Sequence, residues 1–516
     1  MNQLCSLAEL NDNLVPFTAR RITSSLIWCA ENVRNTEVLL KACSYIIDPV
    51  SSASAKTFHA ERYGGSGIQR NGGGARCGFD GNYQVKGMGA NPLVGVGTDG
   101  RHSNGALGAI HAIYEALWGE VLAQVLPYSA VRVQAVLLTN LYTDKAFDRS
   151  HGKSRRALLV RAPVVRPAHF ERAPYFRAKP EYAGQLIHDA RRVRSVIRML
   201  PGNLPVPSEG FSGEARRNPR VHCIEGLCEL ARREAWQMAF CRTRFLRLTT
   251  SPSNIAMDGR LMDFNGLSCL FTGDYPDDFG HQLRLAELVK EPIVLMQGLS
   301  DLCLYIGKYM FDPDFTLMAR LKVEETFQKT FHEAYYYCYL EQLGIPTEFL
   351  PQEGIPDTLK QLVNSLDVLV NKHSDRLCCP DTACGDDSPL QSLVVELIRQ
   401  SQAQTHPVDN DAERDVHFIE AQQCFSRAIH WLTQDSIRRQ INVSSLLKEM
   451  ENHVRKRLQP RKWLGKACLS EGIATLLDEH SDNPYYLREA LSDMGTRMQA
   501  FSREAFGHVN PVRIAV

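Results

Sequence analysis

The feature that most restricts the fold is a stretch dense in glycine, residues 61–81, ERYGGSGIQRNGGGARCGFDG. Glycine destabilises helices and favours turns, so this stretch cannot form a helix interior. NYQVKG follows and is typical of a short β-strand that ends at Lys86. A second glycine-rich turn, GMGANPLVGVGTDGR, leads into a helix expected over residues 106–126. Apolar side chains there recur every three or four positions: Leu107, Ile110, Tyr114, Leu117, Val121 and Val125.

Later segments add strands and then long helices. VRVQAVLLT and RALLVRAPVV are β-branched runs typical of core strands, and PGNLPVPSEGFSG predicts a loop. Helices are expected around LCELARREAWQMAFCRTRFLRL and from about 281 to 342. This order predicts an α+β fold with two lobes. We expect a helical N-terminal segment at 1–60, an N-lobe-like ATP-binding region at 61–205, a C-lobe-like region with a metal-binding segment at 206–372, and a linker and helical C-terminal region at 373–516.

Composition limits the classes of partner. The 59 basic and 58 acidic residues leave a net charge of +1, so no overall field attracts nucleic acid or an anionic membrane. No apolar run approaches the ~20 residues that cross a bilayer. The N-terminal residues MNQLCSLAELNDNLVPFTARR lack the basic start and apolar core of a signal peptide. We therefore expect a cytoplasmic protein whose 15 scattered cysteines are reduced thiols.

Residues suited to binding phosphates follow the glycine-rich stretch. Lys86 ends a strand, and Glu115 and Glu120 on the next helix could orient it. Arg161 and Arg166 lie in and just after another strand and could clamp phosphate oxygens through paired hydrogen bonds. Glycine loops and cations together are typical of nucleotide sites.

A candidate metal-binding segment lies further along, at residues 251–266, SPSNIAMDGRLMDFNG. Asn254 and Asp263 are hard oxygen ligands nine residues apart, of the kind that Mg²⁺ takes beside phosphate oxygens. Kinase-like segments of this type carry an aspartate before the asparagine, which removes a proton from the attacking hydroxyl. Ser253 stands at that position. The residues therefore predict a site for ATP and Mg²⁺ without this base.

These segments resemble the selenoprotein O family of kinase-like enzymes. QVKGMGANP with GTDGR resembles the family's QLKGAG-x-TP and GDGR, and Glu115 and Glu120 keep its E-x4-E spacing. LLVRAPVVRPAHFE resembles its two-arginine segment, although it is two residues shorter between the arginines. SNIAMDGRLMDFNG resembles its DNMSILG-x-x-x-DYGP, with the asparagine-to-aspartate spacing kept. The matches run in order from residue 61 to about 345.

The resemblance implies a kinase-like fold that binds ATP in a flipped orientation and transfers AMP. It implies catalytic roles for Lys86, Glu115, Arg161 and Arg166, and Asn254 and Asp263 as ligands of Mg²⁺. It also implies a set of residues that contact ATP: Lys86, Gly87, Gly89, Asp99, Gly100, Arg101, Arg161 and Arg166.

In length and in its helical C-terminal part, the whole chain also resembles the siderophore-microcin maturation proteins (MchC/MceJ type). That resemblance implies an ATP- and Mg²⁺-dependent enzyme that works with a small acyltransferase-like partner. The pair would join the C-terminal carboxylate of a microcin precursor peptide to a glucosylated catecholate siderophore. An ionised carboxylate needs no base, because its unperturbed pKa is about 3.3–3.7. Ser253 is therefore compatible with a carboxylate acceptor.

Other interpretations remain open from the sequence. The protein could be an AMP-transferase that modifies hydroxyl side chains, or an inactive scaffold that presents peptide to the partner. GVGTDG fits a dinucleotide-binding pattern, but ANPLV is a poor strand before it. Glu120 could belong to a solvated helix face, and HVRKRLQPRKW could contact a partner or siderophore. Two cysteine clusters, His222–Cys223 with Cys228 and CCPDTAC at 378–384, lack a paired zinc framework.

Overall fold

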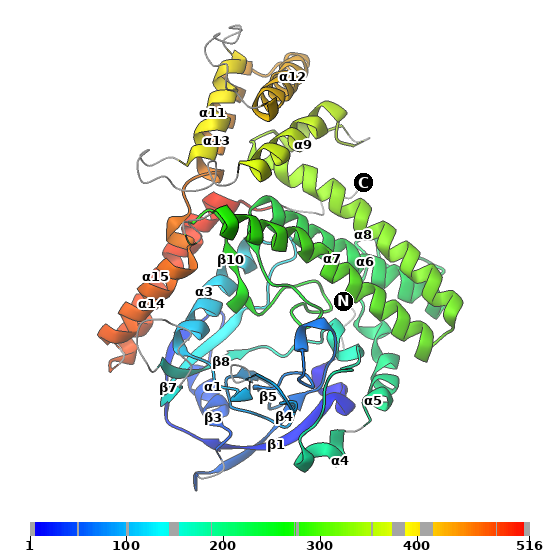
Figure 1. Ribbon diagram of the computed structural model, residues 1–516, viewed down its shortest axis with the longest axis vertical. Coiled ribbons are helices and arrows are strands. Elements are labelled where there is room, and N and C mark those ends of the chain that lie inside the picture. Colours follow the sequence, from blue (N-terminus) through cyan, green and yellow to red (C-terminus); the bar gives the residue numbers. More distant parts are fainter. Residues whose placement is uncertain are drawn as a thin grey trace.

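The computed structural model shows a mixed α+β protein (Figure 1). An antiparallel sheet and its covering helices occupy one end, and long helices form the rest of the molecule. The structure describes the residues 6–48, 51–99, 103–143, 154–186, 188–272, 274, 278–351, 354–373, 388–402, 416–480 and 482–509.

The sheet has the strand order β2-β7-β8-β6-β5-β4-β1-β3. Its strands are β1 (Leu14–Arg21), β2 (Ser24–Cys29), β3 (Tyr45–Ile46), β4 (Ala55–Glu61), β5 (Cys77–Phe79), β6 (Gln84–Lys86), β7 (Val133–Thr143) and β8 (Ser154–Arg161). Every pairing is antiparallel, and β6 lies between β5 and β8. Gln84 lies opposite Arg161 in this register, so the predicted lysine strand and arginine strand are neighbours.

The predicted helical segment over residues 1–60 is wrong. β1, β2, β3 and β4 all lie there, and α1 (Thr36–Cys43) is a short helix between them. β1 and β4 pair along seven residues each, and β2 pairs with β7. Serine, threonine and isoleucine dominate TARRITSSLI, and such residues suit a pleated, half-buried surface. Pairing with strands distant in the sequence therefore overrides the short helical periodicity in this segment.

The predicted helix over 106–126 is confirmed as α3 (Ala109–Val125), which lies against the sheet. Nearly all its side chains are buried, because a second layer covers its outer side. That layer comes from α14 (Lys466–His480) and α15 (Pro484–Phe506), which run beside α3 in Figure 1. The rings of Trp118 and Phe506 lie 6.5 Å apart. The end of the chain therefore completes the core of the sheet region.

Three long helices form the middle of the molecule: α6 (Pro219–Thr243), α7 (Asp278–Tyr309) and α8 (Pro313–Gln342). They confirm the helices predicted around residues 227–248 and 281–342, and they share a hydrophobic core with α3. Short helices α4 (Ala183–Leu186) and α5 (Asp189–Val196) precede them, and β9 (Leu246–Arg247) pairs with β10 (Ser268–Cys269). Among the described helices, none is long and apolar enough to cross a membrane.

A further group of helices projects at the top of Figure 1. It consists of α9 (Asp357–Lys372), α11 (Pro389–Gln402), α12 (Val416–Arg438) and α13 (Val443–Arg457), which pack with one end of α8 around a second hydrophobic core. Cys424 of α12 is buried in that core.

Close packing between α15 and β2 gives a first prediction, concerning Gly495→Ala. A Cβ atom on Gly495 would lie 2.8 Å from the Trp28 ring, so the large ring or the helix has to shift. We expect the free energy of unfolding to fall by about 1–3 kcal/mol, which is the usual cost of overpacking. Urea unfolding followed by circular dichroism measures this change.

Gly472→Ala in α14 is the matched control. A Cβ atom there would meet the flexible end of Met494 at 3.3 Å. Since alanine stabilises a helix interior by up to about 1 kcal/mol relative to glycine, this variant should be as stable as the wild type or more so. Equal stability of the two variants would show that α15 does not pack closely on β2.

Candidate functional site

The candidate site is built around the ammonium group of Lys86 at the end of β6. Its Nζ atom lies 2.7 Å from Glu115 Oε2 and 2.8 Å from Asp263 Oδ1. The lysine and glutamate side chains are almost fully buried, at 1% and 2% exposure, whereas 28% of the Asp263 side chain is exposed. A strand, a helix and a loop distant in the sequence therefore meet at one cation; the sequence predicted the contact of Lys86 with Glu115 but not its contact with Asp263.

Asp263 takes a left-handed backbone conformation, with φ of 63°, just before the turn η8 (Phe264–Gly266). Asn265 in this turn donates a hydrogen bond to Glu115 Oε2, the oxygen that also contacts Lys86. Burial alone would raise the pKa of Asp263, but the charges of Lys86 and Arg76 lower it well below its ordinary value. The partly exposed carboxylate is therefore ionised and available to a cation.

The two glutamates of the E-x4-E motif have different partners. Glu115 contacts Lys86, and Arg161 Nη1 lies 3.4 Å from its other oxygen. Glu120, one helical turn further, forms a bidentate pair with Arg132 near the surface. Only Glu115 therefore orients the lysine, and Glu120 serves to hold the loop before β7.

Both predicted arginines are buried and already paired with groups of the chain. Arg161 donates to Gln84, and Gln84 in turn donates to Glu61. Arg166 lies 3.6 Å from Glu61 Oε2 and donates to the hydroxyl of Tyr63 at 3.3 Å. Burial would raise the pKa of Glu61, but the His169 hydrogen bond and the Arg166 charge lower it to about 2. One buried carboxylate thus links the two arginines.

The segment from Asn254 to Asp263 folds back on itself. The Met262 amide donates to the Asn254 carbonyl at 2.9 Å, which places Asn254 across from the residue before Asp263. The Asn254 amide group donates to the Thr249 carbonyl at 3.2 Å; among the described residues, its side-chain oxygen accepts no hydrogen bond. The two predicted metal ligands thus come from the two ends of one tight loop, each with an oxygen that could bind a cation.

Ser253 lies under the glycine-rich stretch. Its hydroxyl is 2.8 Å from the Ser251 hydroxyl, and Arg166 donates to its carbonyl at 3.0 Å. A Cβ atom on Gly67 would lie 2.5 Å from both hydroxyl oxygens. Glycine at position 67 therefore lets the stretch approach these serines closely, and a larger side chain at position 253 would press against it.

The structure does not bring all the predicted ATP-binding residues together. Gly87 and Gly89 take positive φ values of 98° and 115°, and their amides donate to the Arg76 and Gly105 carbonyls. They are packed against neighbouring segments within the sheet region. Asp99 is exposed and takes no part in the described contacts of Lys86. Gly100 and Arg101 lie outside the described residues.

The sequence interpretation missed Arg76, Asn265 and Glu61. Arg76 precedes Cys77, which lies opposite Lys86 in the β5–β6 pair, and its charge lowers the pKa of Asp263. A signal for Arg76 was present, because Asp-Gly at residues 80–81 favours a tight hairpin turn. No comparable signal marks Glu61, whose role depends on the long-range pairing of β4.

The cysteine clusters do not form metal sites in the described part of the chain, which has no group of three or more candidate ligands. Cys223 and Cys228 are buried in the core, and the His222 ring stacks on Phe211 with centroids 4.0 Å apart. CCPDTAC at 378–384 lies outside the described residues.

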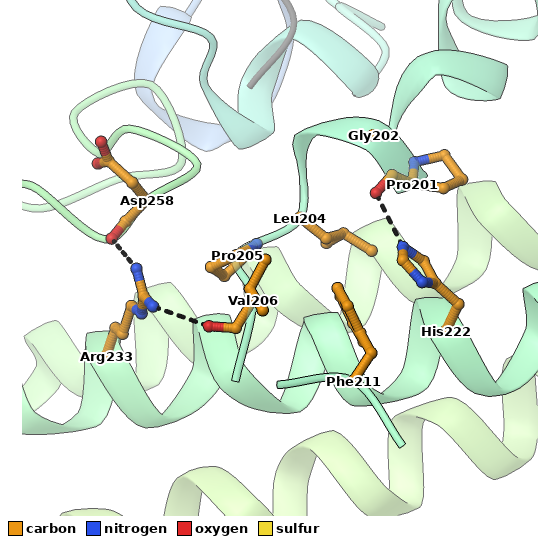
Figure 2. Close-up of a pocket in the computed structure, with 9 residues that line it drawn as sticks. All are labelled: Pro201, Gly202, Leu204, Pro205, Val206, Phe211, His222, Arg233 and Asp258. Atoms are coloured by element: carbon orange, nitrogen blue, oxygen red, sulfur yellow. Dashed lines mark hydrogen bonds between the residues drawn. The ribbon is translucent and has the colours of Figure 1, made fainter. Parts of the chain in front are cut away.

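A separate pocket of about 250 Å³ lies beside α6 (Figure 2). The predicted loop after Pro201, together with Phe211, forms its apolar wall. Arg233 ties that loop to the 254–263 segment, since it donates to the Val206 and Asp258 carbonyls. None of the residues that line this pocket contacts Lys86 or Asp263.

Comparison with known proteins leaves this geometry as the main basis for a function. No protein-family model matches the sequence, and no curated protein is significantly similar to it.

Two further carboxyl groups are buried away from the contacts of Lys86. Glu171 and Glu234 are each 2% exposed, and among the described residues Glu171 Oε1 and Glu234 Oε2 form no hydrogen bond. A Cβ atom on Gly65 would lie 2.6 Å from Glu171 Oε2, so the glycine-rich stretch covers this acid. Burial, followed by the charge of Asp301, raises the pKa of Glu171 to about 8; burial and Glu171 raise that of Glu234.

The raised pKa of Glu171 gives a second prediction. Unfolding releases its proton above the unfolded pKa of about 4.5, whereas the folded protein keeps it until about pH 8. This group therefore makes the free energy of unfolding fall as pH rises from 4.5 to 8, by at most about 1.4 kcal/mol per pH unit. Glu171→Gln should make the decline shallower in urea unfolding at pH 5, 6, 7 and 8.

Glu209→Gln is the control, because Glu209 is exposed in the loop before α6 and should leave the pH dependence unchanged. Parallel stability curves for Glu171→Gln and the wild type would contradict a protonated Glu171.

Proposed function

We propose that the protein is an ATP- and Mg²⁺-dependent enzyme that activates a carboxylate by adenylation. The proposal includes a bilobal, kinase-like arrangement in which the sheet region and the long helices hold the nucleotide between them. One observation carries it: Lys86 on a strand, Glu115 on the adjacent helix and Asp263 of the DFNG turn converge within hydrogen-bond distance. Kinase-like enzymes use this combination to hold nucleotide phosphates and metal.

The charge of the site suits an anionic ligand. Lys86, Arg161 and Arg166 are joined by Arg76, and Glu61, Glu115 and Asp263 oppose them. Cations thus outnumber carboxylates among these seven groups. Arg161 and Arg166 are buried and paired within the chain, so they would set the field around the site. Arg76 is half-buried and is the better candidate for a direct phosphate contact, and Lys86 would reach a phosphate where the ligand displaces Asp263 from it.

Asn254 and Asp263 would hold Mg²⁺. Asp263 is ionised and partly exposed, and the Asn254 side-chain oxygen accepts no hydrogen bond from the residues that the structure describes, so the pair fits a hard cation that also binds phosphate oxygens and water. Bound Mg²⁺ supplies positive charge that offsets the charge of the phosphates.

The proposed reaction balances without a base at position 253. An oxygen of the acceptor carboxylate attacks the α-phosphorus of ATP, and the bond between this phosphorus and the bridging oxygen to the β-phosphorus breaks. The products are an acyl-adenylate and pyrophosphate, and no proton is transferred. Transfer of the acyl group to a hydroxyl then releases AMP and one proton. Lys86 orients the phosphates, and Glu115 orients Lys86.

The resemblance to siderophore-microcin maturation proteins suggests the substrates. The acceptor would be the C-terminal carboxylate of a microcin precursor peptide, and the hydroxyl would belong to a glucosylated catecholate siderophore. A small acyltransferase-like partner would take part in the second step, in the cytoplasm. An AMP-transferase acting on protein hydroxyls is a less suitable assignment, because Ser253 offers no carboxylate base.

An inactive scaffold is the second candidate function. One observation favours it: Lys86 pairs directly with Asp263, so the proposed phosphate ligand and the proposed metal ligand neutralise each other. In that case the site would stabilise the fold, and the chain would present peptide to the partner.

The third prediction concerns the fate of ATP labelled at the α-phosphate. The purified protein with Mg²⁺, precursor peptide, partner and the glucosylated catecholate siderophore should release AMP and pyrophosphate only when peptide is present. Asp263→Asn should lower this rate at least about a hundredfold, because it removes the charged metal ligand. Thin-layer chromatography of the label gives the product and the rate.

Asp258→Asn is the matched control, since Asp258 lies on the same loop and pairs with Arg260. It should keep the wild-type rate within about threefold, as expected for a surface pair. ADP as the product would contradict adenylation. No peptide-dependent turnover with intact peptide and partner would favour the scaffold.

The fourth prediction tests the acceptor. If the attacking group is a carboxylate, Ser253→Asp should not raise the rate, because there is no proton to remove. A hydroxyl acceptor should instead gain roughly 10²–10⁴-fold from a positioned base. The same labelled-ATP assay compares Ser253→Asp with Ser253→Asn, which presses on Gly67 as aspartate does but carries no base. A rise on the carboxylate substrate in the aspartate variant alone would contradict the proposed chemistry.

A further inference from the structure

The beginning of α14 is fastened to the segment that follows Asp263. Lys466 Nζ donates to the Asn265 carbonyl at 2.7 Å. The backbone amides of Lys466 and Ala467 donate to the Asp274 carboxylate at 2.6 and 3.3 Å. A Cβ atom on Gly465 would lie 2.9 Å from that carboxylate, so glycine permits the approach. Lys466 thus contacts both Asn265 and Asp274, which precede it in the sequence by about 200 residues. These contacts hold the short segment that runs from one to the other.

These contacts continue into the candidate site. The Asn265 side chain donates to Glu115 Oε2, the oxygen that Lys86 contacts. Lys466 also lies over the ring of Tyr114, with Nζ 5.5 Å from the ring centre, and the Tyr114 hydroxyl donates to the Leu267 carbonyl at 3.0 Å. The carbonyls on both sides of Gly266 therefore accept hydrogen bonds. The Asn265 carbonyl accepts one from Lys466, and the Leu267 carbonyl accepts one from Tyr114, the residue before Glu115.

The helix that carries Lys466 is itself anchored. Arg461, five residues earlier and 4% exposed, donates to the Arg244 carbonyl at 2.6 Å, just before β9. Leu469 and Ile473 of α14 are buried in the core that contains α3. The Lys466 ammonium is therefore presented from a fixed position.

We propose that Lys466 is a positioning residue for the nucleotide and metal site, so that the C-terminal helices complete this site by fixing the Asn265 backbone. This inference rests on the proposed function, because the affected property is the affinity for Mg·ATP. It also implies that a partner bound to the C-terminal helices could change that affinity through α14.

The fifth prediction uses full-length protein and isothermal titration with Mg·ATP. Lys466→Met keeps the aliphatic chain over Tyr114 and loses the ammonium, and it should weaken binding about tenfold. Lys466→Arg keeps a cation and should bind Mg·ATP nearly as tightly as the wild type. If Lys466 only filled space, the methionine and arginine variants would bind equally well. Lys462→Met is the control, because Lys462 is exposed in the adjacent turn η10 (Lys462–Leu464) and should bind as the wild type does.

Hydrogen exchange separates this inference from the proposed function. Without nucleotide, Lys466→Met should speed amide hydrogen exchange over residues 264–272. In the wild type, binding of Mg·ATP should slow amide exchange at the start of α14, because an effect of α14 on nucleotide affinity requires an equal effect of the nucleotide on α14. The inference is overturned if Lys466→Met binds Mg·ATP as the wild type does, or leaves exchange over 264–272 unchanged. Failure of the wild type to bind Mg·ATP would instead overturn the proposed function.

If Lys466→Met does not fold, amide hydrogen exchange at the start of α14 in the wild-type protein tests the proposed coupling. Slower exchange on addition of Mg·ATP supports the coupling, and unchanged exchange with bound nucleotide contradicts it.

Discussion

The buried ammonium of Lys86 is the group on which the arrangement of the molecule depends. A charge with 1% exposure is strongly destabilising unless carboxylates surround it, and Glu115 and Asp263 supply them. β6, α3 and the turn after the 254–263 loop must all be in place for these contacts to exist. The requirement to neutralise one cation therefore joins β6 and α3 to the loop that carries Asp263.

A network of buried charged and polar side chains connects the partners of Lys86 to Arg166. Arg161 shares Glu115 with Lys86, and Gln84 connects Arg161 to Glu61. Glu61 in turn faces Arg166, whose guanidinium also holds the Ser253 carbonyl. Such buried networks are sensitive to the loss of any one member, since each charge that remains is left without its partner. The network also limits what the arginines can do, because both guanidinium groups already bind buried groups of the chain.

The sequence predicted the parts of this site whose signals are local. A lysine at the end of a short strand and a glutamate in a strongly periodic helix were identified, and Asn254 and Asp263 were singled out from their spacing. The strands in residues 1–60 were missed because their pairing partners are distant, and no local pattern there outweighed the helical periodicity. No local pattern predicts the internal pairing of Arg161 and Arg166, because Glu61 is the last residue of β4, a strand that falls almost entirely within the segment expected to be helical.

The packing of α15 on β2 has a consequence for how the chain folds as it is made. Trp28 of β2 meets Gly495 of α15, so one side of the core around α3 remains uncovered until the residues of α15 have been synthesised. Contacts of such large sequence separation form slowly, and they leave apolar surface exposed in the meantime. We expect the nascent sheet region to depend on chaperones until α14 and α15 have been synthesised and can pack against it.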